Sequence, residues 1–169
     1  EGYDKSDFAC SCRSADCVNA THGRVLWSPR EMLDYGKLPN GKYMLNWPVN
    51  GNDVYMNIVE VPYARRDAAL RPAREKTLRF IYYIQHELGF SHLGIADDEF
   101  GTADGLAYLP YHREGRRLDG VIRLTLARRH FTVPAFRSAT IPSTTTMIAV
   151  LRSGRYPSRP CRRFRCRWG

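Results

Sequence analysis

The sequence contains no acidic residue after Asp119 and no lysine after Lys76. All 17 acidic residues therefore lie in residues 1–119, whereas residues 120–169 contain 11 arginines. The first part is close to neutral, so the net charge of +9 resides in the C-terminal part. A basic arm that binds nucleic acid would show this asymmetry. A tail translated in a different reading frame would show it too.

Long apolar runs and a signal peptide are also absent. No run approaches the roughly 18 apolar residues that would span a membrane, and Glu1-Gly2-Tyr3 does not resemble the start of a signal peptide. The first residue is not Met, so we expect the chain to start within a longer protein. The sequence predicts no membrane partner and leaves the compartment undefined.

Cysteines are few and irregularly spaced. Their odd number argues against a disulfide framework. The nearest histidine, His22, has no partner at the spacing of a zinc finger, so a zinc site is only weakly supported. The five cysteines are Cys10, Cys12, Cys17, Cys161 and Cys166.

The length of 169 residues suits one domain with a sizeable core. Two β-rich runs, Lys42–Trp47 and Asp53–Val61, flank the turn residues Asn50 and Gly51. This pattern predicts a β-hairpin over residues 42–61.

The apolar spacing changes to a helical period between residues 67 and 88. Gly89 is placed as the C-terminal cap and Pro72 suits the first turns, so we predict a helix over about 72–88. Residues 92–110 are interpreted as a loop and residues 118–126 as a strand. The order of elements predicts an α+β fold. The helix should pack against the hairpin through Phe80, Ile81, Ile84 and Leu88.

Histidines and acids between residues 86 and 99 invite comparison with a metal site. His86-Glu87 and His92 give the spacing H-E-x4-H, whereas the helical zinc motif needs histidines four positions apart on one face. We therefore predict no metal site here.

Three arginines, Arg113, Arg116 and Arg117, surround Glu114 just before the predicted strand. Dense guanidinium groups can bind a carboxylate, a phosphate or the negative charge of a reduced flavin. A surface loop in which Glu114 pairs with one arginine gives the same pattern, and spacing alone favours that interpretation.

The predicted hairpin carries a second polar group, made of Asn46, Trp47, Asn52 and Asp53. Amide, carboxylate and indole groups in one hairpin would suit a sugar-like substrate. Turn formation also accounts for most of these residues. They are our candidates for contacts on the substrate side.

Three stretches together are more specific than any one of them: KLPNGKYMLNWPVNGNDVYMNIVE, TLRFIYYIQHELGFSHLGIADDEFGTADGLAYLPYHREGRR and LDGVIRLT. They resemble the middle section of bacterial FAD-dependent oxidoreductases, which carries K-[YF]-x-[IL]-N-W-P, Q-x-E-L-G and P-Y-x-R-E-x-R-R. The resemblance runs from about Lys37 to Thr125. It implies that the intact protein transfers a hydride from a small-molecule substrate to FAD, with residues 1–126 as part of the substrate-side domain.

The resemblance also implies site residues. Arg113, Arg116 and Arg117, followed by Tyr111 and His112, become candidates for flavin-side or substrate-side contacts, while the catalytic base is not assigned. The family receives the FAD pyrophosphate at a G-x-G-x-x-G turn before a helix, and this sequence contains no such turn. We therefore expect this chain alone to bind FAD weakly or not at all, and to be inactive.

After its strand the family continues with a segment like Y-R-T-G-[IV]-x-V-G-D-Y-x-I-D-H-H-H and later with P-F-P-P-V-P-S-F-S-[IV]-P-L-G. Neither motif is present here. Both are permitted by the frame that starts at the third base of each codon, in which the codons of residues 143–147 permit Asp-His-His-His. We therefore predict a frameshift between about Leu126 and His130.

This interpretation makes residues 127–169 an out-of-frame basic tail, which we expect to be disordered. The alternative is a nucleic-acid-binding module over Arg152–Arg167, in which Tyr156, Phe164 and Trp168 would stack on bases. In a disordered tail few core contacts are expected for the apolar residues Phe131, Phe136, Ile148, Val150 and Leu151.

Overall fold

The computed structural model describes residues 3–15, 17, 26–58, 60–112, 116–118, 138–140 and 143–154. Helices and antiparallel sheets are both present in these residues, which confirms the predicted α+β fold. The helical elements are η1 (Lys5–Asp7), α1 (Pro29–Tyr35), η2 (Tyr63–Arg65) and α2 (Arg66–His86). The strands are β1 (Tyr43–Leu45), β2 (Asp53–Met56), β3 (Leu93–Ile95), β4 (Tyr111–His112), β5 (Arg116–Leu118), β6 (Ser138–Thr140), β7 (Ser143–Thr146) and β8 (Ala149–Ser153).

The long helix α2 confirms the predicted helix and extends it toward the N-terminus. It begins at Arg66, so Pro72 lies in its second turn, and Gly89 ends the region with a positive φ of 80°. Leu88 is partly buried against the core. Six residues at helical spacing between residues 67 and 88 are buried: Leu70, Ala73, Thr77, Phe80, Ile81 and Ile84.

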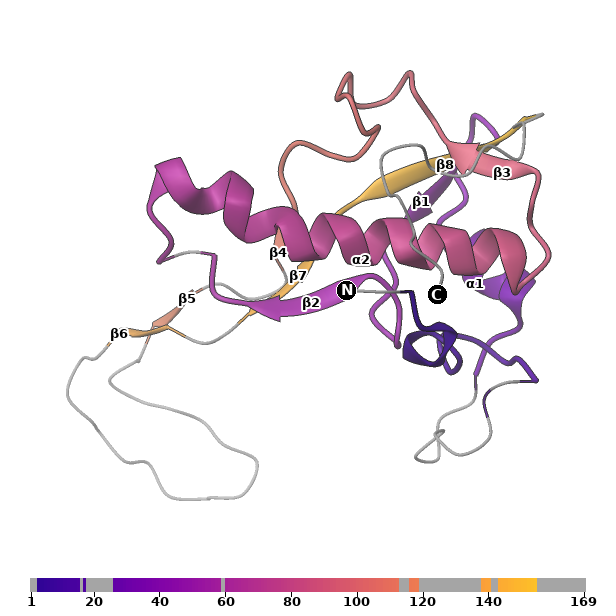
Figure 1. Ribbon diagram of the computed structural model, residues 1–169, viewed down its shortest axis with the longest axis horizontal. Helices are drawn as coiled ribbons and strands as arrows, with labels where there is room; N and C mark the ends of the chain where they lie inside the picture. The colour runs from indigo at the N-terminus through magenta and orange to yellow at the C-terminus, as the bar shows by residue number, and fades with distance from the viewer. Residues whose placement is uncertain are drawn as a thin grey trace, which may run out of the picture.

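One chain segment forms the middle of two sheets. In the first sheet β8 lies between β1 and β3, and in the second β7 lies between β2 and β4. Only Met147 and Ile148 separate β7 from β8. Residues 143–153 therefore run through both sheets, with residues 43–56 on one side and residues 93–112 on the other. Figure 1 shows α2 running past this segment.

The predicted hairpin over residues 42–61 is wrong. Both strands exist, but β1 pairs with β8 and β2 pairs with β7, and the two belong to different sheets. The turn residue Asn50 does take a positive φ of 43°. The loop of residues 46–52 nevertheless carries the chain from one sheet to the next, because a distant strand provides the partner for both of its ends.

The prediction of a disordered tail is wrong for residues 138–140 and 143–154. β6 pairs with β5 in a small separate sheet, and β7 and β8 are central strands. Val150 and Leu151 are buried, with exposures of 4% and 0%, and Ile148 is half-buried. Phe131 and Phe136 lie outside the described residues.

Two further differences concern residues 92–126. β3 lies in the stretch predicted as a loop, where Leu93 is buried against the core. Of the strand predicted over residues 118–126, only Leu118 is described, and it ends β5. The rest of that predicted strand lies outside the described residues.

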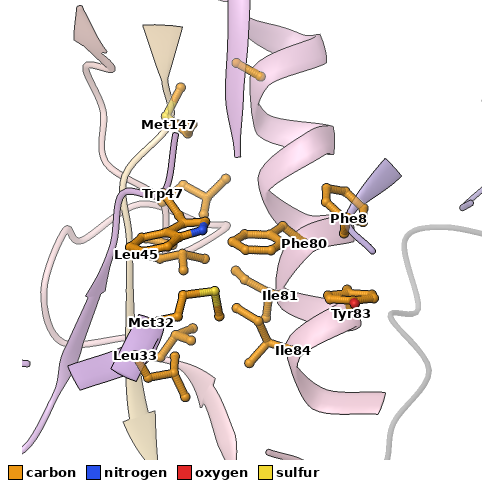
Figure 2. Close-up of a cluster of buried hydrophobic side chains, with 14 of the residues drawn as sticks. Phe8, Met32, Leu33, Leu45, Trp47, Phe80, Ile81, Tyr83, Ile84 and Met147 are labelled. Atoms are coloured by element: carbon orange, nitrogen blue, oxygen red, sulfur yellow. The ribbon is translucent and has the colours of Figure 1, made fainter. Parts of the chain in front are cut away.

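The core lies on two sides of α2, as Figure 2 shows. On one side Phe80, Ile81 and Ile84 face a group from α1, β1 and the following loop. On the other side Phe8 packs with its ring centroid 5.3 Å from that of Phe80. The labelled residues that face α2 in this group are Met32, Leu33, Leu45 and Trp47.

Cys10 and Cys17 form a disulfide, which the cysteine spacing did not predict. Cys12 lies between them in sequence as a fully buried free thiol, and burial raises its pKa. The odd number of cysteines argued against a framework of several disulfides, but it does not exclude a single disulfide between cysteines that are close in sequence. Cys161 and Cys166 lie outside the described residues. In the described part of the chain, no helix has the length and apolarity to cross a membrane.

Candidate functional site

The second sheet brings together residues from both predicted polar groups. Thr146 of β7 lies opposite Asp53 of β2 on one side and opposite Tyr111 of β4 on the other. In the neighbouring row Thr145 lies opposite His112. Side chains alternate along a strand, so the two rows point to opposite faces of the sheet. The sheet thus unites segments that are far apart in the sequence.

Asp53 is held at the start of β2 by two hydrogen bonds. Its carboxylate Oδ1 accepts one from the hydroxyl of Thr146. Its carbonyl oxygen accepts another from Nζ of Lys76 in α2, at 2.7 Å. Burial lowers the pKa of the Lys76 ammonium, and the nearby charges of Asp7 and Asp53 oppose this shift. A carboxylate, a hydroxyl and an ammonium therefore meet where α2 passes β2.

His112 is oriented by the same central strand. Its Nδ1 lies 2.9 Å from the hydroxyl oxygen of Thr145. Burial, and to a smaller extent the charge of Arg66, lowers the pKa of His112. The ordinary value is about 6.5, so the imidazole is neutral near pH 7 and retains one nitrogen that can accept a proton.

The loop of residues 46–52 uses two of the predicted substrate contacts inside the protein. Asn52 is fully buried; its Oδ1 accepts a hydrogen bond from the backbone N–H of Trp47 at 2.9 Å, and its Nδ2 donates to the carbonyl oxygen of Met147 at 3.0 Å. Trp47 is 8% exposed, and Asn46 is half-buried. A role in substrate binding stays a prediction for all three predicted residues of this loop.

The predicted arginine cluster is described only in part. Arg113 lies outside the described residues, and for Arg116 and Arg117 the structure describes the backbone alone, in β5. Tyr111 is 47% exposed on β4 and can be reached from solvent. Contacts between these residues and a flavin or a substrate stay predictions.

Arg152, the first arginine of the alternative nucleic-acid module, is part of the folded structure. Its Nη2 lies 2.9 Å from Oδ1 of Asp97, and its Nη1 lies 3.7 Å from Oδ1 of Asp98. Asp98 also forms an ion pair with Lys42 at 2.9 Å. Nothing in the described part of the chain supports nucleic-acid binding, and residues 155–167 lie outside it.

Sequence reasoning missed Thr145, Thr146 and Lys76. The first two belong to a run of β-branched residues, which is typical of buried strands and was the available signal. No sequence pattern identified Lys76, because its hydrogen bond to Asp53 depends on α2 passing β2 in the folded chain.

The candidate residues on β2 and β4 fall within a region that matches a known family. Residues 1–133 match the FAD dependent oxidoreductase family. The chain belongs to this family. The match extends beyond the resemblance noted over residues 37–125, and it ends before β6. Neither the curated proteins nor the solved structures provide a match to the chain.

An intact FAD-dependent oxidoreductase carries FAD, so one of its helices has to receive the pyrophosphate of this cofactor. The FAD pyrophosphate needs a helix that starts at a glycine-rich turn. α1 instead starts at a capping box of Ser28 and Glu31. η2 ends at Arg65, and α2 begins at the next residue. In the described residues neither helix therefore fits the pyrophosphate. The same residues contain no group of three or more side chains that could hold a metal ion.

Proposed function

We propose that this chain is the substrate-side part of an FAD-dependent oxidoreductase that takes a hydride from a carbohydrate-like substrate. The family match over residues 1–133 carries the proposal. FAD, bound in the intact protein, would supply the acceptor for the hydride. The polar and aromatic residues of segment 46–53 suggest the substrate class.

We assign the proton-accepting role to His112. Removing a hydride from a carbon that bears a hydroxyl group leaves a proton on that oxygen, and a base must take it. The lowered pKa of His112 keeps its imidazole neutral, and β4 places this residue on the strand that pairs with β7.

We also propose that the reading frame shifts between about Leu126 and His130, so that residues 127–169 are out of frame. The family match ends at residue 133, close to this position. Residues 143–147, for which the other frame permits Asp-His-His-His, comprise β7 and the residue after it, and β7 pairs with the strands of Asp53 and His112. Strand pairing uses backbone groups, so β7 can pair in either frame.

The genomic locus tests the frame. Sequencing it with both flanks should reveal a G-x-G-x-x-G unit upstream, together with a frame change between codons 126 and 130. An uninterrupted frame that ends in these arginines, with no flavin-binding unit upstream, would overturn the proposal.

The reaction is tested on the frame-restored protein with its upstream unit. Anaerobic addition of sugars should bleach the flavin absorbance, and His112→Gln should slow bleaching by about 10²- to 10⁴-fold, the usual contribution of a general base. His92→Gln, at an exposed position, is the matched control and should bleach at the original rate. Unchanged bleaching in the His112 variant would remove its assigned role.

A further inference from the structure

The disulfide between Cys10 and Cys17 closes a loop that touches the aromatic residues beside the first sheet. The carbonyl oxygen of Ser11 in this loop accepts a 2.6 Å hydrogen bond from Nε1 of Trp47. The backbone N–H of Arg13 donates to the carbonyl oxygen of Trp27 at 2.7 Å. Two backbone groups of the disulfide loop therefore hold two tryptophans.

These tryptophans form a three-ring cluster with Tyr35 of α1. The ring centroids of Trp27 and Trp47 are 5.4 Å apart, and Tyr35 lies 5.5 Å from Trp27 and 5.7 Å from Trp47. Trp47 is buried, while Trp27 and Tyr35 are exposed. Because a buried indole N–H needs an acceptor, the position of Trp47 depends on the disulfide loop.

Trp47 connects this loop to the junction between the sheets. Its backbone N–H donates to Oδ1 of Asn52, and Asn52 donates to the carbonyl oxygen of Met147 between β7 and β8. The hydrogen-bonded groups are buried, so a change at one is felt by the next. A continuous chain of hydrogen bonds thus leads from the disulfide loop to the strand that carries Thr146.

We propose that the Cys10–Cys17 disulfide is a redox-sensitive latch that fixes the loop of residues 46–52 and, through it, the junction of the two sheets. The disulfide is the two-state element, and the reductant is a small dithiol. Cys17 is half-buried and Cys10 is buried, so the dithiol reaches the Cys17 sulfur first. This inference does not depend on flavin binding.

The reaction balances as a thiol–disulfide exchange. A thiolate of the reductant bonds to the sulfur of Cys17, the Cys10–Cys17 bond breaks, and Cys10 leaves as a thiolate that takes up a proton. The second thiol of the reductant then displaces Cys17 and closes the oxidised reductant. Two electrons and two protons pass to the protein, which gains two thiols.

The test uses the full chain with Cys161→Ser, Cys166→Ser and Trp168→Phe. Its remaining tryptophans are then Trp27 and Trp47, and its remaining cysteines are Cys10, Cys12 and Cys17. Thiol titration in denaturant should find one free thiol before treatment with dithiothreitol and three after it, as the disulfide and the single free thiol require. Three thiols before treatment would overturn the proposal.

Reduction should shift the tryptophan emission to the red and increase quenching by acrylamide, and reoxidation should reverse both changes. It should also speed amide exchange in residues 143–151. The double variant Cys10→Ser and Cys17→Ser in the same background should show the emission of the dithiol form, both with and without reductant. Full reduction that leaves tryptophan emission and amide exchange unchanged would overturn the latch. The comparison of oxidised and reduced protein gives this result without any substitution of Cys10 or Cys17.

Discussion

The side-chain amide of Asn52 donates a 3.0 Å hydrogen bond to the carbonyl oxygen of Met147, 95 positions later in the sequence. The hydroxyl of Thr77 in α2 donates to the same oxygen at 3.2 Å. Asn52 is the last residue of the loop between β1 and β2, and Met147 is the first residue after β7. One carbonyl group therefore joins the loop, the helix and the central segment of both sheets.

Replacing Asn52 with alanine should destabilise the protein strongly. The side chain is fully buried, and its loss leaves buried backbone groups of Trp47 and Met147 without this partner. We expect a loss of about 3 kcal/mol in the free energy of unfolding, measured by urea denaturation. Asn57→Ala is the control, since Asn57 bonds to Glu60 in an exposed turn, and should cost under about 1 kcal/mol. Equal losses of unfolding free energy in both variants would contradict the stabilising role assigned to the Asn52 hydrogen bonds.

Gly51 is required by the close approach of the chain at Trp47. A Cβ atom at Gly51 would lie 2.3 Å from the carbonyl oxygen of Trp47 and 2.9 Å from its Cβ. Gly51→Ala should therefore cost about 1–3 kcal/mol by overpacking and should alter the tryptophan emission. Asn50→Gly is the neighbouring control, because glycine readily adopts the positive φ found there. A fully stable Gly51→Ala protein would contradict the described loop.

His112 should titrate below its ordinary pKa of about 6.5. The unfolded chain then binds more protons than the folded chain as pH falls through this value, so stability decreases as pH falls toward the folded pKa. NMR titration of the imidazole measures the midpoint. His112→Gln should remove the part of the pH dependence of unfolding that sets in as the pH falls through about 6.5. A midpoint above the ordinary value would reverse the sign and contradict the burial of the ring.

The chain alone should bind FAD weakly or not at all. In the described residues neither α1 nor α2 begins at a glycine-rich turn that could receive the pyrophosphate. Dialysis of the purified protein against FAD, followed by an absorption spectrum, measures the bound fraction. A yellow protein with one flavin per chain would contradict this expectation.

Local patterns in the sequence predicted α2 well. Phe80, Ile81 and Ile84 follow the helical period and are buried, because one face of a helix packs against whatever lies beneath it. The partners of β1 and β2 could not be predicted in the same way. Asn50-Gly51 indicates a turn, but not whether its flanking strands pair with each other or with a distant segment.

The C-terminal segment shows why composition misled the sequence analysis. Eleven arginines without an acid supported the frameshift interpretation, from which we predicted disorder over residues 127–169. The run from Thr144 to Leu151 nevertheless contains no charge. A strand buried on both faces is a continuous β-branched and apolar run, so it lacks the alternation that identifies an exposed strand. Arg152 follows it and finds acidic partners in Asp97 and Asp98, far away in the sequence.

Asp53 was predicted as part of the polar group in the hairpin, and His112 was predicted only because the family resemblance implied it. Their common sheet was not predicted, because it depends on β7, in which Thr146 lies opposite Asp53 and Thr145 lies opposite His112. The two side chains point to opposite faces of this sheet. The site therefore depends on the same segment that joins the two sheets.

Amide hydrogen exchange of residues 143–151 tests this dependence most directly. As the central strand of both sheets, the segment should exchange as slowly as the buried part of α2. A chain that ends at residue 142 should lose protection throughout β1–β4, whereas a chain that ends at Gly154 keeps every paired residue of β7 and β8 and should retain it. Rapid exchange of residues 143–151 in the full chain, with α2 still protected, would contradict the account.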